Sequence, residues 1–275
     1  MRAPSRPLAL ALVTAALVAG TATPASPAPA IHRGEDAAIG TYPFMVSLRL
    51  ADTPDSPRCG GTLIEADLVL TAAHCVAGVP QGGIVAVVGA DMADWPGAPR
   101  VGTLGHAVPA TFDLSVDNRD DIAVLLLTTP QASPTVELAA AEPRVGDRTV
   151  TTGWGCTNAP PVCEVMATGL QASRQVVIDE AASCGTDVFW TRPLYHAPTT
   201  ICTKGVRARS TINRGDSGGP LLVRGRCGAG LRQVGVTSLG ADSTTRLYAG
   251  FTSIPVEADW IADAVGAFRG PSAAM

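Results

Sequence analysis

The chain has 275 residues, of which 46% are hydrophobic, enough to bury a sizeable core in one or two domains. Its formal net charge is −4, only 4% of its residues are aromatic and it contains no basic run, so the composition argues against a nucleic-acid-binding protein. A mild acidic balance of this kind affects solubility rather than fold.

The first 30 residues have the organisation of a secretory signal peptide. Arg2 and Arg6 supply positive charge, and residues 8–18 form an apolar run that is too short to span a bilayer. Prolines at positions 24, 27 and 29 would end a helix, which argues against a buried N-terminal helix. We expect residues 1–30 to be a signal peptide, either alone or together with a short pro-segment that is trimmed afterwards, and the mature protein to be extracellular with no membrane segment.

Short runs typical of β-strands follow along most of the chain. In residues 44–50 apolar side chains alternate with others, which predicts a half-buried strand. Similar runs occur at 68–71, 84–88, 122–128, 149–152, 175–178, 221–223, 233–238 and 246–254. Clusters of Gly, Pro, Asp and Asn separate them, and many short strands with turn signals between them predict an all-β sandwich or barrel.

One region near the C-terminus has helical spacing instead. Its apolar residues recur on one face of a helix, at Val256, Trp260, Ile261 and Val265. The pattern predicts a C-terminal helix over residues 256–267, followed by a loose tail over 268–275.

Three short motifs carry the chemistry. Ser217 lies in the hexapeptide Gly-Asp-Ser-Gly-Gly-Pro, although a glycine-rich hexamer alone is more often only a turn. His74 ends Thr-Ala-Ala-His before a cysteine, and Asp121 begins Asp-Ile-Ala-Val-Leu-Leu. His, Asp and Ser in this chain order match one of the known convergent catalytic triads. On these motifs the chain resembles the trypsin/chymotrypsin-like serine protease family, in its secreted bacterial form, from residue 31 to about residue 260.

The resemblance implies a fold and a domain layout. The fold is all-β, with two six-stranded antiparallel β-barrels, the active site in the cleft between them, and a C-terminal α-helix. We expect the protease domain over residues 31–265, with the first barrel at about 31–135 and the second at about 145–255. Prolines 130, 134 and 143 interrupt the strand pattern at the expected seam, residues 129–145.

The resemblance also implies a role for each catalytic residue. A serine hydroxyl needs a base within hydrogen-bond reach, so His74 would take the proton of Ser217 while Asp121 fixes the imidazole. The neighbouring Asp120 is the alternative aspartate, and we favour a solvated loop position for it. The backbone N–H groups of Gly215 and Ser217 would form the oxyanion hole.

A buried activation pair is implied at the start of the mature chain. In the family a free ammonium on Ile31 would pair with Asp216, and a buried carboxylate does need a cationic partner. Relatives are mostly cut after Arg or Lys, whereas Ala30 ends a small-x-small sequence typical of signal peptidase sites. His32 and Arg33 depart from the usual Ile-Val-Gly-Gly start.

Substrate preference depends on the specificity pocket. Relatives that cut after Lys or Arg carry an Asp six residues before the serine, where this chain has Thr211. A neutral residue cannot compensate a buried ammonium, so strict tryptic specificity is not expected. The resemblance then implies a pocket for apolar or small side chains, with Ser238 and Gly240 on its wall and Ser238 also bonded to the catalytic aspartate.

A competing interpretation is a preference for acidic side chains. It requires that a local basic residue turn into the pocket, and the candidates are Lys204, Arg207, Arg209 and Arg214. Two nearby positions depart from the family pattern. Asn213 stands where many relatives have a cysteine that bridges to the far pocket wall, and Leu239 replaces the usual aromatic residue.

The seven cysteines fit an exported, oxidising setting. The resemblance implies disulfides Cys59–Cys75 and Cys184–Cys202. Our own interpretation adds a local Cys156–Cys163 clip, which leaves Cys227 either as a free buried thiol or as an alternative partner for that pair.

No metal or cofactor is expected. Asp91 and Asp94 lie in a loop where some relatives bind calcium, but two acids without further partners are more often a solvated turn. The sequence thus predicts a monomeric secreted serine endopeptidase, with protein or peptide substrates and protein inhibitors as its partners. The alternative is a catalytically silent homologue that binds or regulates.

Overall fold

The computed structural model describes residues 30–113, 119–158, 163–179, 188–189, 192–193, 198–207, 210–225, 230–240 and 248–270. The expected signal peptide lies outside these ranges except for Ala30. Within them, no helix combines the length and the apolar character needed to cross a membrane.

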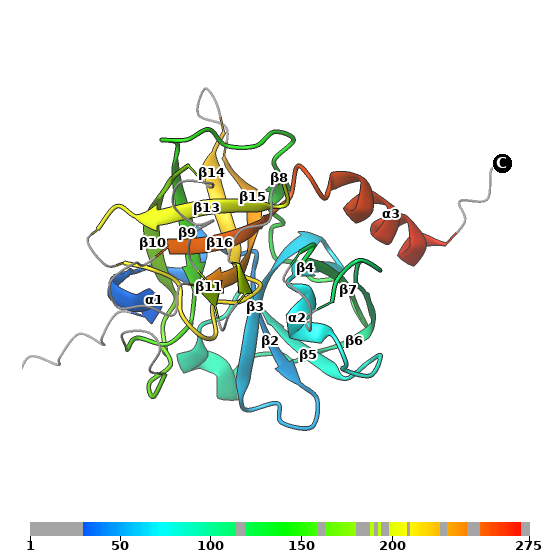
Figure 1. Cartoon of the computed structure of the whole chain (residues 1–275). Coiled ribbons are helices and arrows are strands. Elements are labelled where there is room, and N and C mark those ends of the chain that lie inside the picture. The colour runs from blue at the N-terminus through cyan, green and yellow to red at the C-terminus, as the bar shows by residue number, and fades with distance from the viewer. Residues whose placement is uncertain are drawn as a thin grey trace, which may run out of the picture.

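The first half of the chain closes into a six-stranded antiparallel barrel in the order β2-β3-β4-β7-β6-β5 (Figure 1). The ring closes because β2 pairs with both β3 and β5. Its strands are β2 (Met45–Leu50), β3 (Pro57–Glu65), β4 (Leu68–Thr71), β5 (Ile84–Val88), β6 (Val101–Ala107) and β7 (Ala123–Leu127).

The second half closes in the same way, in the strand order β10-β13-β16-β15-β14-β9. The first strand of this order, β10, pairs with its neighbour β13 and also with the last strand, β9. These strands are β9 (Arg148–Gly153), β10 (Gln171–Val177), β13 (Thr200–Gly205), β14 (Pro220–Arg224), β15 (Leu231–Gly240) and β16 (Tyr248–Ser253). Two short strands pair with this barrel: β1 (Glu35–Asp36) lies antiparallel to β10, and β8 (Glu137–Leu138) lies parallel to β15. Separately, β11 (Val188–Phe189) pairs with β12 (Arg192–Pro193). The prediction of two six-stranded barrels is confirmed.

The described helices are short except for the last. They are the turn α1 (Ala30–Arg33), η1 (Ile39–Thr41), α2 (Ala73–Val76), η2 (Met92–Gly97) and α3 (Ala258–Arg269). Helix α3 confirms the predicted C-terminal helix, and it packs on the first barrel near β7 through the buried Ile261 and Ala264. It begins and ends two residues later than expected, so Val256 precedes it and is exposed.

One strand expectation needs correction. Strand β2 exists, but it is buried on both faces, since even Ser47 and Arg49 are no more than 2% exposed. The Arg49 guanidinium stacks on the Trp95 ring of η2, 3.3 Å from its centroid. On the same face Met45 lies against the second barrel, where its sulfur accepts a hydrogen bond from Thr152 Oγ1 at 3.2 Å. The alternation of apolar and polar residues in β2 therefore does not predict which side chains are exposed, because the second barrel and η2 cover the face that carries Met45, Ser47 and Arg49.

Candidate active site

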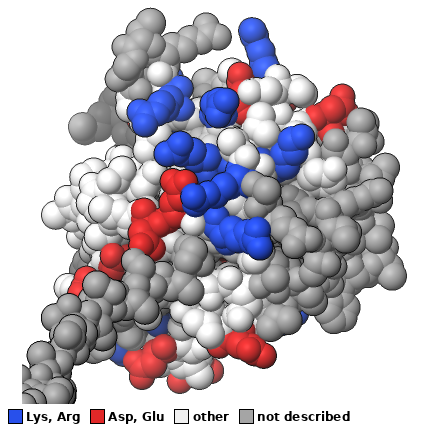
Figure 2. Space-filling model, turned by 90° about the vertical axis from the view of Figure 1, so that its left-hand side faces the viewer, with Lys and Arg blue, Asp and Glu red and all other residues white. Residues whose placement is uncertain are grey.

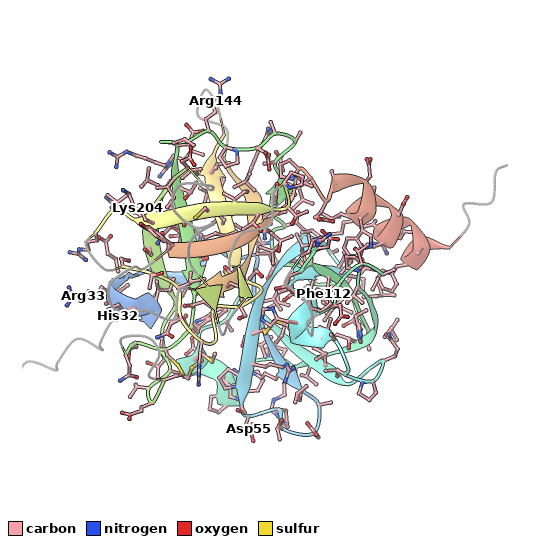
Figure 3. The ribbon with its side chains drawn as sticks, in the orientation of Figure 1. His32, Arg33, Asp55, Phe112, Arg144 and Lys204 are labelled. Carbon is pink, nitrogen blue, oxygen red and sulfur yellow. A yellow bond between two sulfur atoms is a disulfide. The ribbon has the colours of Figure 1, made fainter. Side chains whose placement is uncertain are left out.

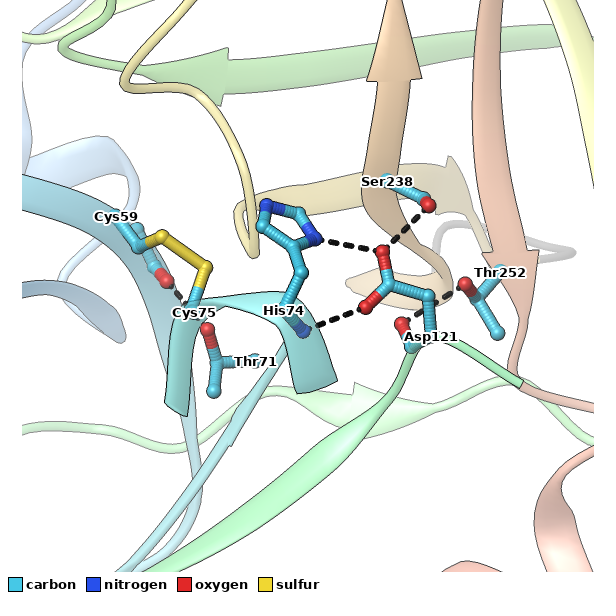
Figure 4. A network of polar contacts seen from close by, with 8 residues as sticks. Cys59, Thr71, His74, Cys75, Asp121, Ser238 and Thr252 are labelled. Atoms are coloured by element: carbon cyan, nitrogen blue, oxygen red, sulfur yellow. Dashed lines mark hydrogen bonds and ion pairs between the residues drawn. A yellow bond between two sulfur atoms is a disulfide. The ribbon is translucent and has the colours of Figure 1, made fainter. Parts of the chain in front are cut away.

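The centre of the site is a buried aspartate that holds a histidine (Figure 4). His74 lies in α2 and Asp121 directly before β7, so both come from the first barrel. The imidazole Nδ1 is 2.7 Å from Asp121 Oδ2, and the His74 backbone N–H donates to Oδ1 at 2.9 Å. Since Nδ1 is held by the carboxylate, Nε2 is the nitrogen of the neutral ring that is left to accept a proton.

The second barrel fixes this aspartate from the other side. Ser238 on β15 donates to Asp121 Oδ2 at 2.6 Å, and Thr252 on β16 donates to the Asp121 carbonyl at 2.9 Å. Asp120 instead accepts a hydrogen bond from Thr111 Oγ1 at 2.5 Å and forms no bond to the histidine. Of the two neighbouring acids, only Asp121 thus contacts His74, and it does so where the barrels meet.

The two charges stabilise each other. Burial alone would lower the pKa of His74, but the attraction and hydrogen bond of Asp121 outweigh it, so the pKa of His74 is raised. Burial would likewise raise the pKa of Asp121, yet the imidazole and the Ser238 hydroxyl hold that pKa below its ordinary value. The pair therefore favours an imidazolium beside a carboxylate.

The turn that carries Ser217 packs directly on the segment that leads to His74. Gly60 N–H on β3 donates to the Ser217 carbonyl at 2.7 Å, and Gly218 N–H donates to the Thr237 carbonyl at 2.8 Å. Gly218 has φ +79°, and a Cβ there would overlap Thr71 Oγ1, so this position requires glycine. The Ser217 hydroxyl and the His74 imidazole, both described, form no hydrogen bond in this structure.

Two N–H groups in the same turn stand out because they lack an acceptor. The N–H groups of Gly215 and Ser217 bond to no described residue, whereas the Asp216 N–H between them donates to the Asn213 carbonyl. Gly215 has φ +93° and lies close against Met166 and Gly155, so a side chain there would force the turn apart. Both residues are half-buried, so their N–H groups can donate hydrogen bonds to an oxygen atom that enters the turn beside Ser217.

Asp216 is buried beneath this turn. Its carboxylate accepts hydrogen bonds from Gly155 N–H and Asn213 N–H, both at 2.8 Å, and no described cation pairs with it. Burial raises the pKa of Asp216 to about 7, although these two bonds oppose the rise. Ile31 is fully buried in α1, and the neighbouring His32 carbonyl accepts a bond from Thr211 N–H at 3.1 Å. The start of the expected mature chain is thus packed against the segment that leads to Asp216.

The described part of the expected specificity pocket has a neutral base. Thr211 is 1% exposed, and its hydroxyl has no hydrogen-bond partner among the described residues. A Cβ at Gly240 would lie 3.4 Å from Ile212 Cγ1, so Gly240 packs against Ile212, the residue after Thr211. The basic candidates Lys204, Arg207 and Arg214 are exposed, while Arg209 and residues 241–247 lie outside the described residues.

Sequence reasoning missed the role of Asn213. Its side-chain amide donates to the carbonyls of Cys156 and Asn158, at 3.2 and 2.8 Å, and its own N–H binds Asp216. It therefore ties residues 156–158 to the serine turn by hydrogen bonds, at a position where many relatives have a cysteine. An amide side chain three residues before a buried acid is the only sequence signal for this.

The cysteine pairings agree with expectation where the structure describes both partners. Disulfides Cys59–Cys75 and Cys156–Cys163 are present. Cys202 is also disulfide-bonded, but Cys184 and Cys227 lie outside the described residues, so its pairing stays a prediction.

Asp91 has a structural partner that the sequence did not indicate. Its Oδ1 accepts hydrogen bonds from Trp154 Nε1 at 3.1 Å and from Leu170 N–H at 2.7 Å, so it links the two barrels next to Gly155. Asp94, the other acid of this loop, is exposed. Among the described residues the one cluster with metal-ligand atoms close together contains His74 and two cysteines, whose sulfurs are joined in a disulfide.

Comparison with known proteins agrees with this architecture. The family model Trypsin matches residues 31–261. Chymotrypsin-C of Rattus norvegicus is 30% identical over 92% of this chain and 96% of that protein, and trypsin theta of Drosophila erecta is 27% identical over 84% of each. The chain belongs to the trypsin family of serine proteases. Among solved structures, mouse neuropsin, a serine protease, has a TM-score of 0.71 at 22% identity, covering 86% of this chain and all of its own. A mutant of human heparin binding protein has a TM-score of 0.70 at 22% identity, and the match covers 88% of this chain and 98% of that protein.

Proposed function

We propose that the mature chain is a secreted serine endopeptidase that hydrolyses peptide bonds through an acyl-enzyme. The observation that carries the proposal is the position of the two N–H groups in the Ser217 turn that no described residue accepts. This turn packs against Thr71, three residues before the histidine of the His74–Asp121 pair. A nucleophile, a base held by an acid, and oxyanion donors are the parts that acyl transfer needs.

Each step uses a described group. As Ser217 Oγ attacks the scissile carbonyl, His74 Nε2 takes its proton, and the buried Asp121 stabilises the resulting imidazolium. The carbonyl oxygen becomes an oxyanion that the Gly215 and Ser217 N–H groups bind, and one such donor contributes about 3 kcal/mol of transition-state stabilisation. His74 then protonates the leaving amine, and water hydrolyses the acyl-enzyme by the same steps in reverse.

The neutral, buried Thr211 supports cleavage after apolar or small side chains. A Lys or Arg side chain would bury its charge there without an acidic partner, which costs several kcal/mol. Processing after Ala30 would free the Ile31 amine for Asp216 and so make export itself the activating step.

A catalytically silent homologue is the second candidate, because the Ser217 hydroxyl is not bonded to His74 in this structure. Catalytic hydrogen bonds are often long before substrate binds, so this spacing is compatible with activity. The test is cleavage of a peptide library by the purified mature protein, with Ser217→Ala and the exposed-serine control Ser56→Ala. We expect cleavage after apolar or small residues that only Ser217→Ala abolishes. No cleavage by the parent protein would refute the proposal, and dominant cleavage after Arg would refute the pocket assignment.

A further inference from the structure

A cavity of about 160 Å³ lies on the outer side of the second barrel, away from the triad. Three segments line it: residues 33–35 at the start of the mature chain, residues 172–174 of β10, and residues 206, 207 and 210 after β13. Figure 2 shows that Lys and Arg side chains gather on this face of the molecule, and Figure 3 shows Arg33 and Lys204 on the same side.

The charge of the cavity is opposite to that of the whole chain. Arg33, Arg174 and Arg207 line it, and Glu35 is the only acid among its lining residues. Glu35 reaches Arg174 at 3.6 Å and Arg207 at 3.5 Å, both long for an ion pair, and no ion pair joins Arg33 to a described residue. Three arginines and one glutamate therefore line the cavity, in a protein whose net charge is −4.

Two of the lining residues are serines whose buried hydroxyls bond to each other. Ser173 Oγ and Ser210 Oγ are 2.5 Å apart and share one hydrogen bond, and Gln175 Nε2 donates to Ser173 Oγ at 2.6 Å. The shared bond uses one of the two hydroxyl hydrogens, whichever serine donates it. Ser173 lies on the buried face of β10 with Gln171 and Gln175, so the serine pair joins two segments of the cavity lining from within the barrel.

We propose that this cavity binds a tetrahedral oxyanion, phosphate or sulfate, free or as a monoester. Guanidinium groups bind such oxygens through paired, charge-assisted hydrogen bonds, and three arginines line this cavity. A bound anion would join residues 33–35 to residues 206, 207 and 210 across the cavity. The site is separate from the proposed catalytic residues, so its binding test does not depend on proteolytic activity.

The test measures the binding of inorganic phosphate and inorganic sulfate to the mature protein by calorimetry and thermal unfolding, in chloride buffer at constant ionic strength. We expect saturable binding and a concentration-dependent rise in the unfolding temperature. Losing one charge-assisted hydrogen bond lowers affinity by about tenfold or more. Arg33→Gln, Arg174→Gln and Arg207→Gln should each show such a loss, whereas Arg144→Gln, which removes the same charge elsewhere on the surface, should not.

Binding of methyl phosphate distinguishes a site for a phosphate monoester from a site for the free ion. Binding equal to that of phosphate indicates a site open to an ester-linked group, and weaker binding indicates a site for the free ion. No saturable binding, or equal losses of affinity in Arg144→Gln and the three cavity variants, would overturn the proposal.

Discussion

The charge state of Asp216 gives the sharpest prediction about activation. With residue 30 still attached, the buried carboxyl has no described cationic partner and its pKa is raised to about 7, from 3.8. A shift of about three units corresponds to roughly 4 kcal/mol against ionisation in the folded state. Since the folded pKa is above the unfolded one, this destabilisation is absent below about pH 4, grows as the pH rises, and is complete above about pH 7. A free ammonium on Ile31 would remove most of it.

Two preparations that differ by one residue test this account. One begins at Ile31 and the other at Ala30, and urea unfolding is followed for both from pH 4 to pH 7.5. We expect equal free energies of unfolding near pH 4 and a growing advantage for the Ile31 chain, up to about 4 kcal/mol near neutral pH. Asp216→Asn should abolish the difference between the two preparations. Parallel pH profiles for the Ile31 and Ala30 chains would refute the pairing of the Ile31 amine with Asp216.

Three further predictions concern residues around the turn and the triad. Asp121→Asn should keep the fold but lower turnover by about 10⁴-fold. It should also shift the acid limb of the pH–rate profile to lower pH, since it removes the charge that raises the histidine pKa. Asp120→Asn should have little effect on turnover, and the reverse result would place the catalytic aspartate one residue earlier. Gly218→Ala should abolish turnover and lower the unfolding temperature, because φ is +79° there and a Cβ would overlap the Thr71 hydroxyl. A variant that is active and equally stable would contradict the requirement for glycine, since it would show that the turn can relax. Asp91→Ala should lower the free energy of unfolding by about 1–3 kcal/mol, because it leaves two hydrogen-bond donors unpaired. The control Asp94→Ala, at an exposed position, should leave this free energy unchanged. Equal effects of the two variants in urea titrations would contradict the role of Asp91 in linking the barrels.

Strand prediction succeeded where apolar residues dominate a run and failed where they do not. Strands β4 and β5 have the expected bounds, while β3, β6 and β13 were not predicted at all. In β10 the strand begins at Gln171, four residues before the expected start. Gln171, Ser173 and Gln175 are all at most 3% exposed, and Ser173 and Gln175 bond to each other. A hydropathy pattern cannot recognise a polar strand face that is buried because its side chains bond to one another.

The site divides in a similar way. His74, Asp121 and Ser217 could be proposed from the sequence because each lies in a contiguous motif of distinctive composition. The bonds of Asn213 and Asp91 were missed, although both residues were noted, because their partners are 55–57 and 63–79 residues away, respectively, and no local pattern encodes such bonds. The hydrogen bond from Ser238 to Asp121, across 117 residues, was expected only through the family resemblance.

The most direct test of the central claim is covalent labelling of the mature protein with a serine-reactive phosphonate, with the adduct located by peptide mass mapping. A nucleophile activated by a base and an oxyanion hole reacts with such a reagent, whereas an ordinary exposed serine does not. We expect one adduct, on Ser217, that is absent from the Ser217→Ala and His74→Ala variants. An unlabelled mature protein, or an adduct on another serine that persists in Ser217→Ala, would contradict the assignment of Ser217 as the nucleophile.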